Sequence, residues 1–201
     1  MILENKLNIT DPAELAREEE KISKKRAKEM FDTEYLNTLD AGTFQALKAI
    51  HKYLFEEIYE FAGEIRKVNI AKGNFRFTPL AYIEEAVKNI EKMPQSTYEE
   101  IIEKYVEMNI AHPFREGNGR STRIWLDLIL KKELHLVVDW SKVDKTDYLL
   151  AMERSPIKDT EIKELLKQAL TDKTNDREVY MKGIDNSYLY EGYLSFKTDE
   201  L

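Results

Sequence analysis

The sequence contains no cysteine and has few glycines, histidines and prolines. Its 201 residues include seven glycines, five prolines and three histidines. Without cysteine, disulfides and thiolate metal sites are excluded, which is compatible with a reducing cytoplasm. Glycine and proline are the strongest local breakers of regular structure, so a chain with so few of both is expected to be mostly helical. The few glycines that remain are then expected to have individual local reasons.

Long apolar runs and an excess of basic charge are also missing. No run of 18 apolar residues occurs, and the N-terminal residues lack the apolar core of a signal peptide. The 31 basic and 38 acidic residues give a formal net charge of −7, which argues against non-specific binding to nucleic acid or anionic membranes. We therefore expect residues 1–201 to form a single cytoplasmic domain with no nucleic-acid or membrane partner.

Apolar residues recur at helical spacing along most of the chain. Residues 125–130 are apolar on nearly all sides, which predicts a central, buried helix. A last, short helix is expected to begin near residues 185–187. Other helices are expected to start at Asp11-Pro12, Asp40, Thr78-Pro79, Ser96 and Ser155-Pro156.

One segment departs from the helical pattern. Residues 66–77 alternate apolar and polar positions on both sides of Lys72-Gly73-Asn74, which predicts a β-hairpin with a glycine-containing turn. One hairpin cannot support a sheet core, so we expect an exposed flap on a helical body. The predicted fold class is an all-α helical bundle with one small hairpin.

The densest chemical signal is the segment His112-Pro-Phe-Arg-Glu-Gly-Asn-Gly-Arg-Ser-Thr-Arg123, which follows one predicted helix and starts the next. Gly117 and Gly119 let the backbone turn sharply and approach a ligand without a Cβ in the way. The free N–H groups and positive end of a helix N-terminus favour an anion. We therefore expect the backbone of Gly117, Asn118 and Gly119 to cradle an anion.

Charged side chains surround this expected cradle. Arg120 and Arg123 lie three apart, so we expect them to share a helix face and converge on the anion. Glu116 offers the hard oxygen that Mg²⁺ favours, and His112 can accept a proton from a hydroxyl group. Each residue alone has an ordinary structural explanation. Together they match the requirements of phosphoryl or nucleotidyl transfer.

The same segment resembles the signature of the Fic (filamentation induced by cAMP) family, His-Pro-Phe-x-(Asp/Glu)-Gly-Asn-Gly-Arg-x-x-Arg, at every fixed position. Upstream, Phe61-Ala-Gly-Glu-Ile-Arg66, with Lys72 and Gly73 after it, resembles the family segment that leads into a target-positioning flap. The resemblance covers about residues 40–180. It implies an all-α Fic fold.

The resemblance also implies protein adenylylation, in which AMP passes from ATP to a Ser, Thr or Tyr hydroxyl of a target protein. His112 would deprotonate the hydroxyl and Glu116 would hold Mg²⁺, with Mn²⁺ or Ca²⁺ as alternatives. The flap around Lys72 and Gly73 would hold the target strand by backbone pairing. The ATP phosphates would contact Gly117, Asn118, Gly119, Arg120 and Arg123.

Near the end of the chain, Ser187-Tyr-Leu-Tyr-Glu191-Gly192 resembles the family's inhibitory motif, (Ser/Thr)-x-x-x-Glu-(Gly/Asn), in the single-domain subclass. We expect Ser187 to cap a short inhibitory helix over about residues 185–195. Glu191 would pair with Arg123 in the place of the ATP γ-phosphate. For an arbitrary protein, the ordinary interpretation of Glu191 is a solvated acid.

Two further hypotheses concern this C-terminal motif. Tyr188, Tyr190 and Tyr193 cluster there, so AMP attached to one of them by self-modification would disfavour docking of the helix. Glu191 is also a candidate to activate water for the removal of AMP from a target. The sequence leaves the balance of transfer and removal open.

Other functions stay open at this point. One is a Fic-fold enzyme with another donor, transferring UMP, phosphate or phosphocholine. Another is a non-catalytic helical binding module, such as the antidote of a toxin system. The joint presence of His112, Glu116 and both arginines favours AMP transfer. The target and any homo-oligomer are not determined by these residues, and His51 and His135 are expected to be structural.

Overall fold

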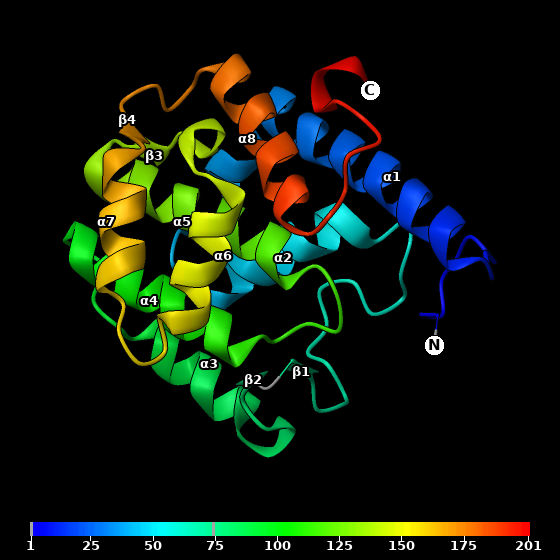
Figure 1. Ribbon diagram of the computed structural model, residues 1–201, viewed down its shortest axis with the longest axis horizontal. Coiled ribbons are helices and arrows are strands. Elements are labelled where there is room, and N and C mark those ends of the chain that lie inside the picture. Colours follow the sequence, from blue (N-terminus) through cyan, green and yellow to red (C-terminus); the bar gives the residue numbers. More distant parts are fainter. Residues whose placement is uncertain (1, 74) are drawn as a thin grey trace.

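The computed structural model describes residues 2–73 and 75–201, which form eight α-helices, one β-hairpin and one further short antiparallel strand pair (Figure 1). The helices are α1 Pro12–Asp32, α2 Phe44–Phe55, α3 Ile83–Glu91, α4 Tyr98–Ala111, α5 Asn118–Leu134, α6 Lys145–Arg154, α7 Thr160–Gln168 and α8 Arg177–Tyr190. This confirms the predicted helical fold class. No helix of the described chain is both long enough and apolar enough to cross a membrane.

The predicted hairpin is present. Strand β1, Ala71–Lys72, pairs antiparallel with β2, Phe75–Arg76, and Gly73 has a left-handed φ of 58°. Asn74, which we placed in the turn, lies outside the described residues. A second antiparallel pair, β3 Val137–Val138 with β4 Leu170–Thr171, was not predicted, because its two strands are too short to show alternation and lie far apart in sequence.

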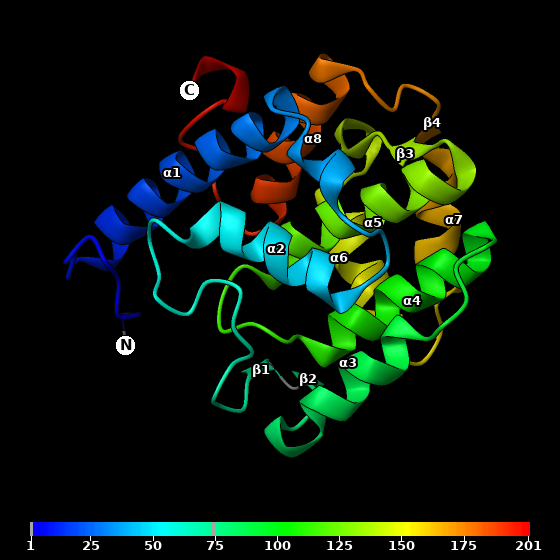
Figure 2. The same cartoon turned by 180° about the vertical axis from the view of Figure 1, so that it is seen from behind.

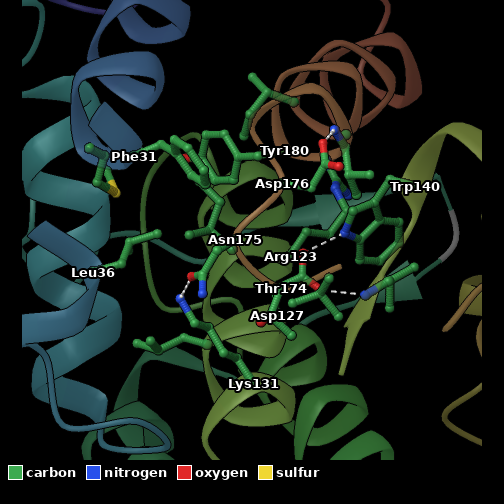
Figure 3. Close-up of a pocket in the computed structure, with 18 of the residues that line it drawn as sticks. Phe31, Leu36, Arg123, Asp127, Lys131, Trp140, Thr174, Asn175, Asp176 and Tyr180 are labelled. Atoms are coloured by element: carbon green, nitrogen blue, oxygen red, sulfur yellow. Dashed lines mark hydrogen bonds between the residues drawn. The ribbon is translucent and has the colours of Figure 1, made fainter. Parts of the chain in front are cut away.

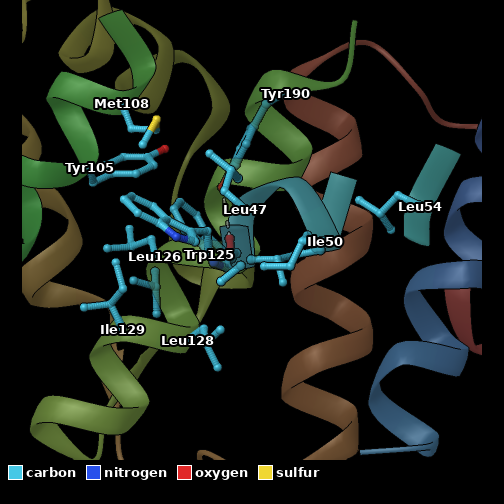
Figure 4. Close-up of a cluster of buried hydrophobic side chains, with 14 of the residues drawn as sticks. Leu47, Ile50, Leu54, Tyr105, Met108, Trp125, Leu126, Leu128, Ile129 and Tyr190 are labelled. Carbon is cyan, nitrogen blue, oxygen red and sulfur yellow. Dashed lines mark hydrogen bonds between the residues drawn. The ribbon is translucent and has the colours of Figure 1, made fainter. Parts of the chain in front are cut away.

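Helix α5 is the centre of the core, as expected. It packs against α2, α4 and α8, and Figure 4 shows its Trp125, Leu126 and Ile129 among side chains of the neighbouring helices. The Trp125 indole N–H donates to the carbonyl of Thr43 at 2.9 Å, so this large buried ring leaves no polar atom unsatisfied. The second half of the segment of residues 112–123 forms the first turns of α5. The core around α5 therefore fixes the position of that segment.

The helix starts were only partly predicted. Asp11 caps α1 as expected, by accepting from the N–H of Glu14. Asp40, Ser96 and Ser155 are not caps. Thr43 caps α2, Thr97 caps α4 in a capping box, and α7 begins only after Asp159. In each case the N-cap is a Thr or Asp that lies one to four positions after the predicted residue. The sequence therefore predicts that a cap is present but not its exact position.

Helix α8 is longer than the inhibitory helix expected over residues 185–195. Asp176 caps it by accepting from the N–H of Val179, and the helix ends at Tyr190. Ser187 therefore lies in the last turn and is not a cap, and Glu191 is the first residue after the helix. Gly183 obscured the pattern, because a glycine inside a helix resembles a break in the sequence.

Helices α1 and α8 lie side by side, and residues 193–201 return along α1 (Figures 1 and 2). The ammonium of Lys24, on α1, is buried against Glu20 at 3.0 Å and Asp185 at 3.2 Å. The Glu20 carboxylate accepts the backbone N–H groups of Ser195 and Phe196. We call this set of contacts the α1 latch, because it ties α8 and the following residues to α1.

Candidate active site

A cleft of about 740 Å³ collects most of the predicted site residues. Its walls come from the hairpin, the motif loop, the start of α5, one face of α6 and the end of α8. The predicted residues that line it are Lys72, Gly73, His112, Glu116, Gly117, Asn118, Gly119, Arg123 and Glu191. Residues more than 100 positions apart in the chain thus meet in one cavity of a size typical for a small-molecule site.

His112 stands immediately after the last turn of α4, in a left-handed backbone conformation with φ 47° and ψ 61°. The ring of Phe77, from the hairpin segment, stacks on the imidazole with 3.7 Å between centroids. Burial is the main cause that lowers the pKa of His112, to about 4. The imidazole is therefore neutral at pH 7 and able to accept a proton.

Arg66 holds the backbone around His112 in place. Its guanidinium is buried and donates to the carbonyl of His112 at 2.8 Å and to the carbonyl of Val68 at 2.6 Å. A further bond to the carbonyl of Thr78 ties the end of the hairpin segment to the same side chain. We did not assign Arg66 a role from the sequence. The Ala-Gly-x-x-Arg spacing was the signal that it matters.

The loop between α4 and α5 is fixed by short-range contacts. The Asn118 side chain accepts from the N–H of Phe114 and donates to its carbonyl, both at 2.8 Å. Gly117 has φ 76°, and a Cβ there would lie 2.4 Å from the ring of Phe55. No side chain caps α5, so its first backbone N–H groups remain available to an anion in the cleft.

His51 supports this loop from behind. Its Nδ1 accepts from the N–H of Gly63 at 2.8 Å, so the proton is on Nε2, which donates to the carbonyl of Glu116 at 2.8 Å. Burial lowers the pKa of His51 to about 3, which keeps the ring neutral and preserves both bonds. The structural role expected for His51 is therefore a specific one, because it positions the motif loop.

Arg123 is buried and bound to the last turn of α8. Its Nε donates to the hydroxyl of Ser187 at 2.7 Å, and Nη2 donates to the Ser187 carbonyl at 2.8 Å and to Glu191 Oε1 at 3.0 Å. Nη1 donates to the hydroxyl of Tyr148 at 3.1 Å. The docked end of α8 thus occupies most of the hydrogen-bonding capacity of this guanidinium.

Glu191 lies directly over the start of α5. Burial by itself would raise the pKa of its carboxyl, but Arg123 and Arg120 outweigh burial and hold the pKa below its usual range. A Cβ built on Gly119 would fall 2.3 Å from Glu191 Oε1. The glycine therefore allows the carboxylate to approach the N-terminus of α5, where an anion is favoured.

Arg120 is placed differently from our expectation. It does not line the cleft; Arg123 hydrogen-bonds Glu191 there, whereas Arg120 acts on that carboxylate through its charge. Its Nη1 donates to Glu19, on α1, at 2.6 Å, and its Nη2 donates to Glu116 at 3.1 Å. The buried carboxylate of Glu19 explains this, because spacing along α5 cannot reveal a partner on another helix.

Glu116 is the one acidic residue of the motif and lies at the edge of the cleft, with its side chain 41% exposed. Its Oε1 already accepts from Gly117 and Arg120. Among the described residues, no group of three or more His, Asp or Glu side chains could hold a metal ion. One half-exposed carboxylate fits the way Mg²⁺ binds together with phosphates, rather than in a protein cage.

The three tyrosines of the C-terminal motif are turned inward. Tyr188 and Tyr190 are buried, and the hydroxyl of Tyr190 donates to the carbonyl of Val143 at 2.8 Å. The hydroxyl of Tyr193 donates to Glu19 at 2.9 Å. None of these hydroxyls lines the cleft while α8 is docked.

Comparison with known proteins finds similar sequences that are named protein adenylyltransferases. The chain is 31% identical to the protein adenylyltransferase VbhT of Bartonella schoenbuchensis, over 89% of this chain but only 39% of that protein. It is 30% identical to the probable protein adenylyltransferase y4lH of Sinorhizobium fredii, over 77% of this chain and 83% of that protein.

Solved structures give the same result for the fold. BepC of Bartonella tribocorum, crystallised with bound AMPPNP, superposes with a TM-score of 0.69 at 20% identity, covering 85% of this chain and 93% of that one. Residues 41–130 match the Fic/DOC family. From this match and the two similar sequences, we conclude that the chain belongs to the Fic/DOC family.

Proposed function

We propose that this protein is a protein adenylyltransferase that transfers AMP from ATP to a Ser, Thr or Tyr hydroxyl of a target protein. The observation that carries the proposal is the cleft that His112 and the uncapped N-terminus of α5 line together. The names of the two similar sequences support the same activity. A bound nucleotide in the similar fold of BepC supports ATP as the donor.

In the proposed reaction, the Nε2 or Nδ1 lone pair of His112 takes the proton of the target hydroxyl. The hydroxyl oxygen attacks the α-phosphorus of ATP, a new P–O bond forms, and the bond to pyrophosphate breaks. The N–H groups at the start of α5 neutralise charge that develops on the phosphate oxygens. Lys72 and Gly73 border the same cleft, and we propose that their strand aligns the target backbone.

We further propose that the docked α8 is a brake. Glu191 and Ser187 occupy the guanidinium of Arg123, which would otherwise be free to bind the ATP γ-phosphate. Two negative groups, the Glu191 carboxylate and the phosphate, would compete for the same cation. Transfer therefore requires that Glu191 leave Arg123.

Glu116 would hold Mg²⁺ in this reaction. When bound, the ion neutralises phosphate charge and supplies electrostatic stabilisation of the leaving group. Since the chain offers one carboxylate at this place, we expect Mg²⁺ alone to leave the Tm unchanged and Mg²⁺ with ATP to raise it. Saturation at about 100 times the Kd adds about 2.7 kcal/mol to the free energy of unfolding. A rise with Mg²⁺ alone would contradict the shared site.

The direct test is incorporation of labelled AMP. We expect the Glu191→Gly variant to incorporate much more AMP than the wild-type protein into a target or into itself, because Arg123 is released. Adding His112→Ala to that variant should lower the rate by about 10²–10⁴-fold, while ATP binding measured by thermal shift persists. Equal incorporation by wild type and Glu191→Gly would refute the brake. Near-normal transfer without His112 would refute the base.

Two extensions rest on the same geometry. AMP attached to Tyr188, Tyr190 or Tyr193 would prevent redocking of α8, because these side chains pack inward in the docked state. Mass spectrometry of the Glu191→Gly variant after incubation with ATP would locate any such adduct. Glu191 borders the cleft and can orient water for removal of AMP from a modified target.

The alternative that the enzyme uses another nucleotide donor has its own test. Labelled UTP replaces labelled ATP in the same incorporation assay.

A further inference from the structure

A second cavity, of about 390 Å³, lies between the end of α1, the face of α5 from Arg123 to Lys131 and the length of α8 up to Ser187 (Figure 3). Arg123 lies in the wall of this cavity and in the wall of the active-site cleft. The volume falls within the range of small-molecule sites. We refer to it as the α1–α5–α8 cavity. The nucleotide site described above does not use it.

The walls of this cavity are mostly apolar. Apolar side chains come from α1, from the segment after it, from β3 and from α8, and include Met30, Phe31, Leu36, Val137, Val179 and Ile184. A largely apolar space of this size favours the ring or chain of an organic molecule over an ion or a sugar.

Three carboxyl groups line the cavity: Glu34 is exposed and Asp176 caps α8, whereas the carboxyl of Asp127, on α5, lies among the apolar side chains. Its Oδ1 accepts from the N–H of Val138 at 2.9 Å, and its Oδ2 accepts from the indole N–H of Trp140 at 2.8 Å (Figure 3). A carboxylate can accept about four hydrogen bonds, so about half of its capacity is unused. No described Lys or Arg pairs with it, and burial raises the pKa of Asp127 to about 7.

Among the other polar groups of the wall, Glu34 and Lys173 are exposed to solvent, and those deeper in the cavity have partners. The hydroxyl of Tyr180 donates to the carbonyl of Ala27 at 2.9 Å, and the hydroxyl of Ser187 accepts from Arg123. At the rim, Lys131 donates to Asn175 Oδ1 at 2.7 Å. Asp127 is therefore the polar group that can select a ligand, and it selects a hydrogen-bond donor with positive charge.

We propose that the α1–α5–α8 cavity binds a small, mainly apolar amine, whose ammonium group pairs with Asp127 and whose ring or chain fills the space against α8. The ammonium supplies the cation that this buried carboxyl lacks in the chain itself. The apolar part replaces solvent along the helices.

Ligand binding in this cavity is coupled to α8, because Val179, Gly183 and Ile184 form part of its wall. An amine that binds only when α8 is docked stabilises the docked state by mass action. At about 100 times its Kd, it makes opening of α8 about 100-fold rarer. The binding does not depend on the proposed function; only the consequence, slower AMP transfer, rests on it.

The test uses tryptamine as the probe and the full ¹⁵N-labelled chain, without ATP. The two tryptophans give two indole N–H signals, and only Trp140 donates to Asp127, whereas Trp125 donates to Thr43 in the core. We expect tryptamine to shift the Trp140 signal in a saturable way and to leave the Trp125 signal in place. An unmoved Trp140 signal would overturn the proposal.

Matched probes and variants test the ammonium–carboxylate pair. 3-Ethylindole, which has the same ring and no amine, should bind about 10- to 100-fold more weakly, and tryptamine should lose as much affinity for Asp127→Asn. The exposed Asp147→Asn, on α6, should bind tryptamine as the wild type does. Equal affinity for both probes would overturn the pairing.

A third variant and a second measurement guard against misfolding of Asp127→Asn. Val179→Phe keeps Asp127 and fills the cavity from the first turn of α8, so it should lose tryptamine binding. Hydrogen exchange of the amides over residues 184–190 should slow by about 100-fold at 100 times the Kd. Retained binding in Val179→Phe would place the probe elsewhere, and unchanged exchange would refute coupling to α8.

Discussion

At the scale of single residues, His112 owes its protonation state to its neighbours. The ring of Phe77 covers the imidazole, and Arg66 fixes its backbone from the other side. Both contacts come from the segment between α2 and α3. The hairpin segment therefore does more than border the cleft, because it shields from water the imidazole that we propose as the base.

This environment predicts how His112 titrates. The neutral imidazole should persist down to a midpoint near pH 4, well below the ordinary value of 6.5, because burial disfavours the charged form. The capacity to accept a proton is thus lost only as the pH falls through that midpoint. NMR titration of the wild-type imidazole measures it directly. In Phe77→Ala, which uncovers the ring, the midpoint should rise towards 6.5.

A wild-type midpoint at or above 6.5 would contradict the buried environment. A midpoint in Phe77→Ala equal to that of the wild type would contradict the role of the Phe77 ring. The matched variant Phe75→Ala removes the neighbouring aromatic ring, which packs on Phe77 at 5.0 Å and has no ring stacking on His112. We expect a smaller change of midpoint in Phe75→Ala than in Phe77→Ala.

At the scale of elements, the contact of α8 with Arg123 depends on how firmly α1 holds α8. In the α1 latch, Asp185 faces the buried ammonium of Lys24 and also accepts from the N–H and hydroxyl of Thr198. Asp185 therefore joins three parts of the chain, and neither it nor its partners Lys24 and Thr198 line the cleft. Weakening this junction should release the brake without changing the site.

We predict that Asp185→Asn increases AMP incorporation above wild type by about 5- to 30-fold, because loss of one charge-assisted contact costs about 1–2 kcal/mol of α8 docking. Incorporation of labelled AMP measures the effect, and circular dichroism verifies the helix content. Asp147→Asn, an exposed change of the same kind on α6, should leave incorporation unchanged. A rate for Asp185→Asn equal to wild type would show that the latch does not govern docking.

The elements also show what the sequence could and could not predict. The start of α1 and the hairpin were predicted because their signals are local. The extent of α8 was not, since Gly183 resembles a break and yet lies inside the helix against Trp140. The orientation of Arg120 was missed for a related reason. Its partner Glu19 precedes it by 101 residues, and no local spacing encodes that contact.

At the scale of the whole molecule, stability is concentrated around α5. Leu126 is fully buried there, in contact with the core shown in Figure 4. Leu126→Ala should lower the free energy of unfolding by about 2–5 kcal/mol, through lost burial and a residual cavity. That corresponds to a fall in Tm of about 4–20 °C for a chain of this size.

Urea unfolding of both Leu126→Ala and a surface control measures this effect. Leu194 is 72% exposed, so Leu194→Ala should change the free energy of unfolding by less than about 0.5 kcal/mol. If the two variants were destabilised equally, α5 would not be the centre of the core.

The position of α8 at the end of the chain has a consequence for folding during synthesis. During synthesis, the ribosome adds Arg123 first and reaches Glu191 after a further 68 residues. At usual rates of synthesis this takes about 3–14 s. However, Ile184, Tyr188 and Tyr190 of α8 are themselves part of the core around α5. The nascent chain cannot close that core until α8 has emerged. Completion of the core and pairing of Glu191 with Arg123 thus coincide, so each new molecule folds with α8 already docked on Arg123.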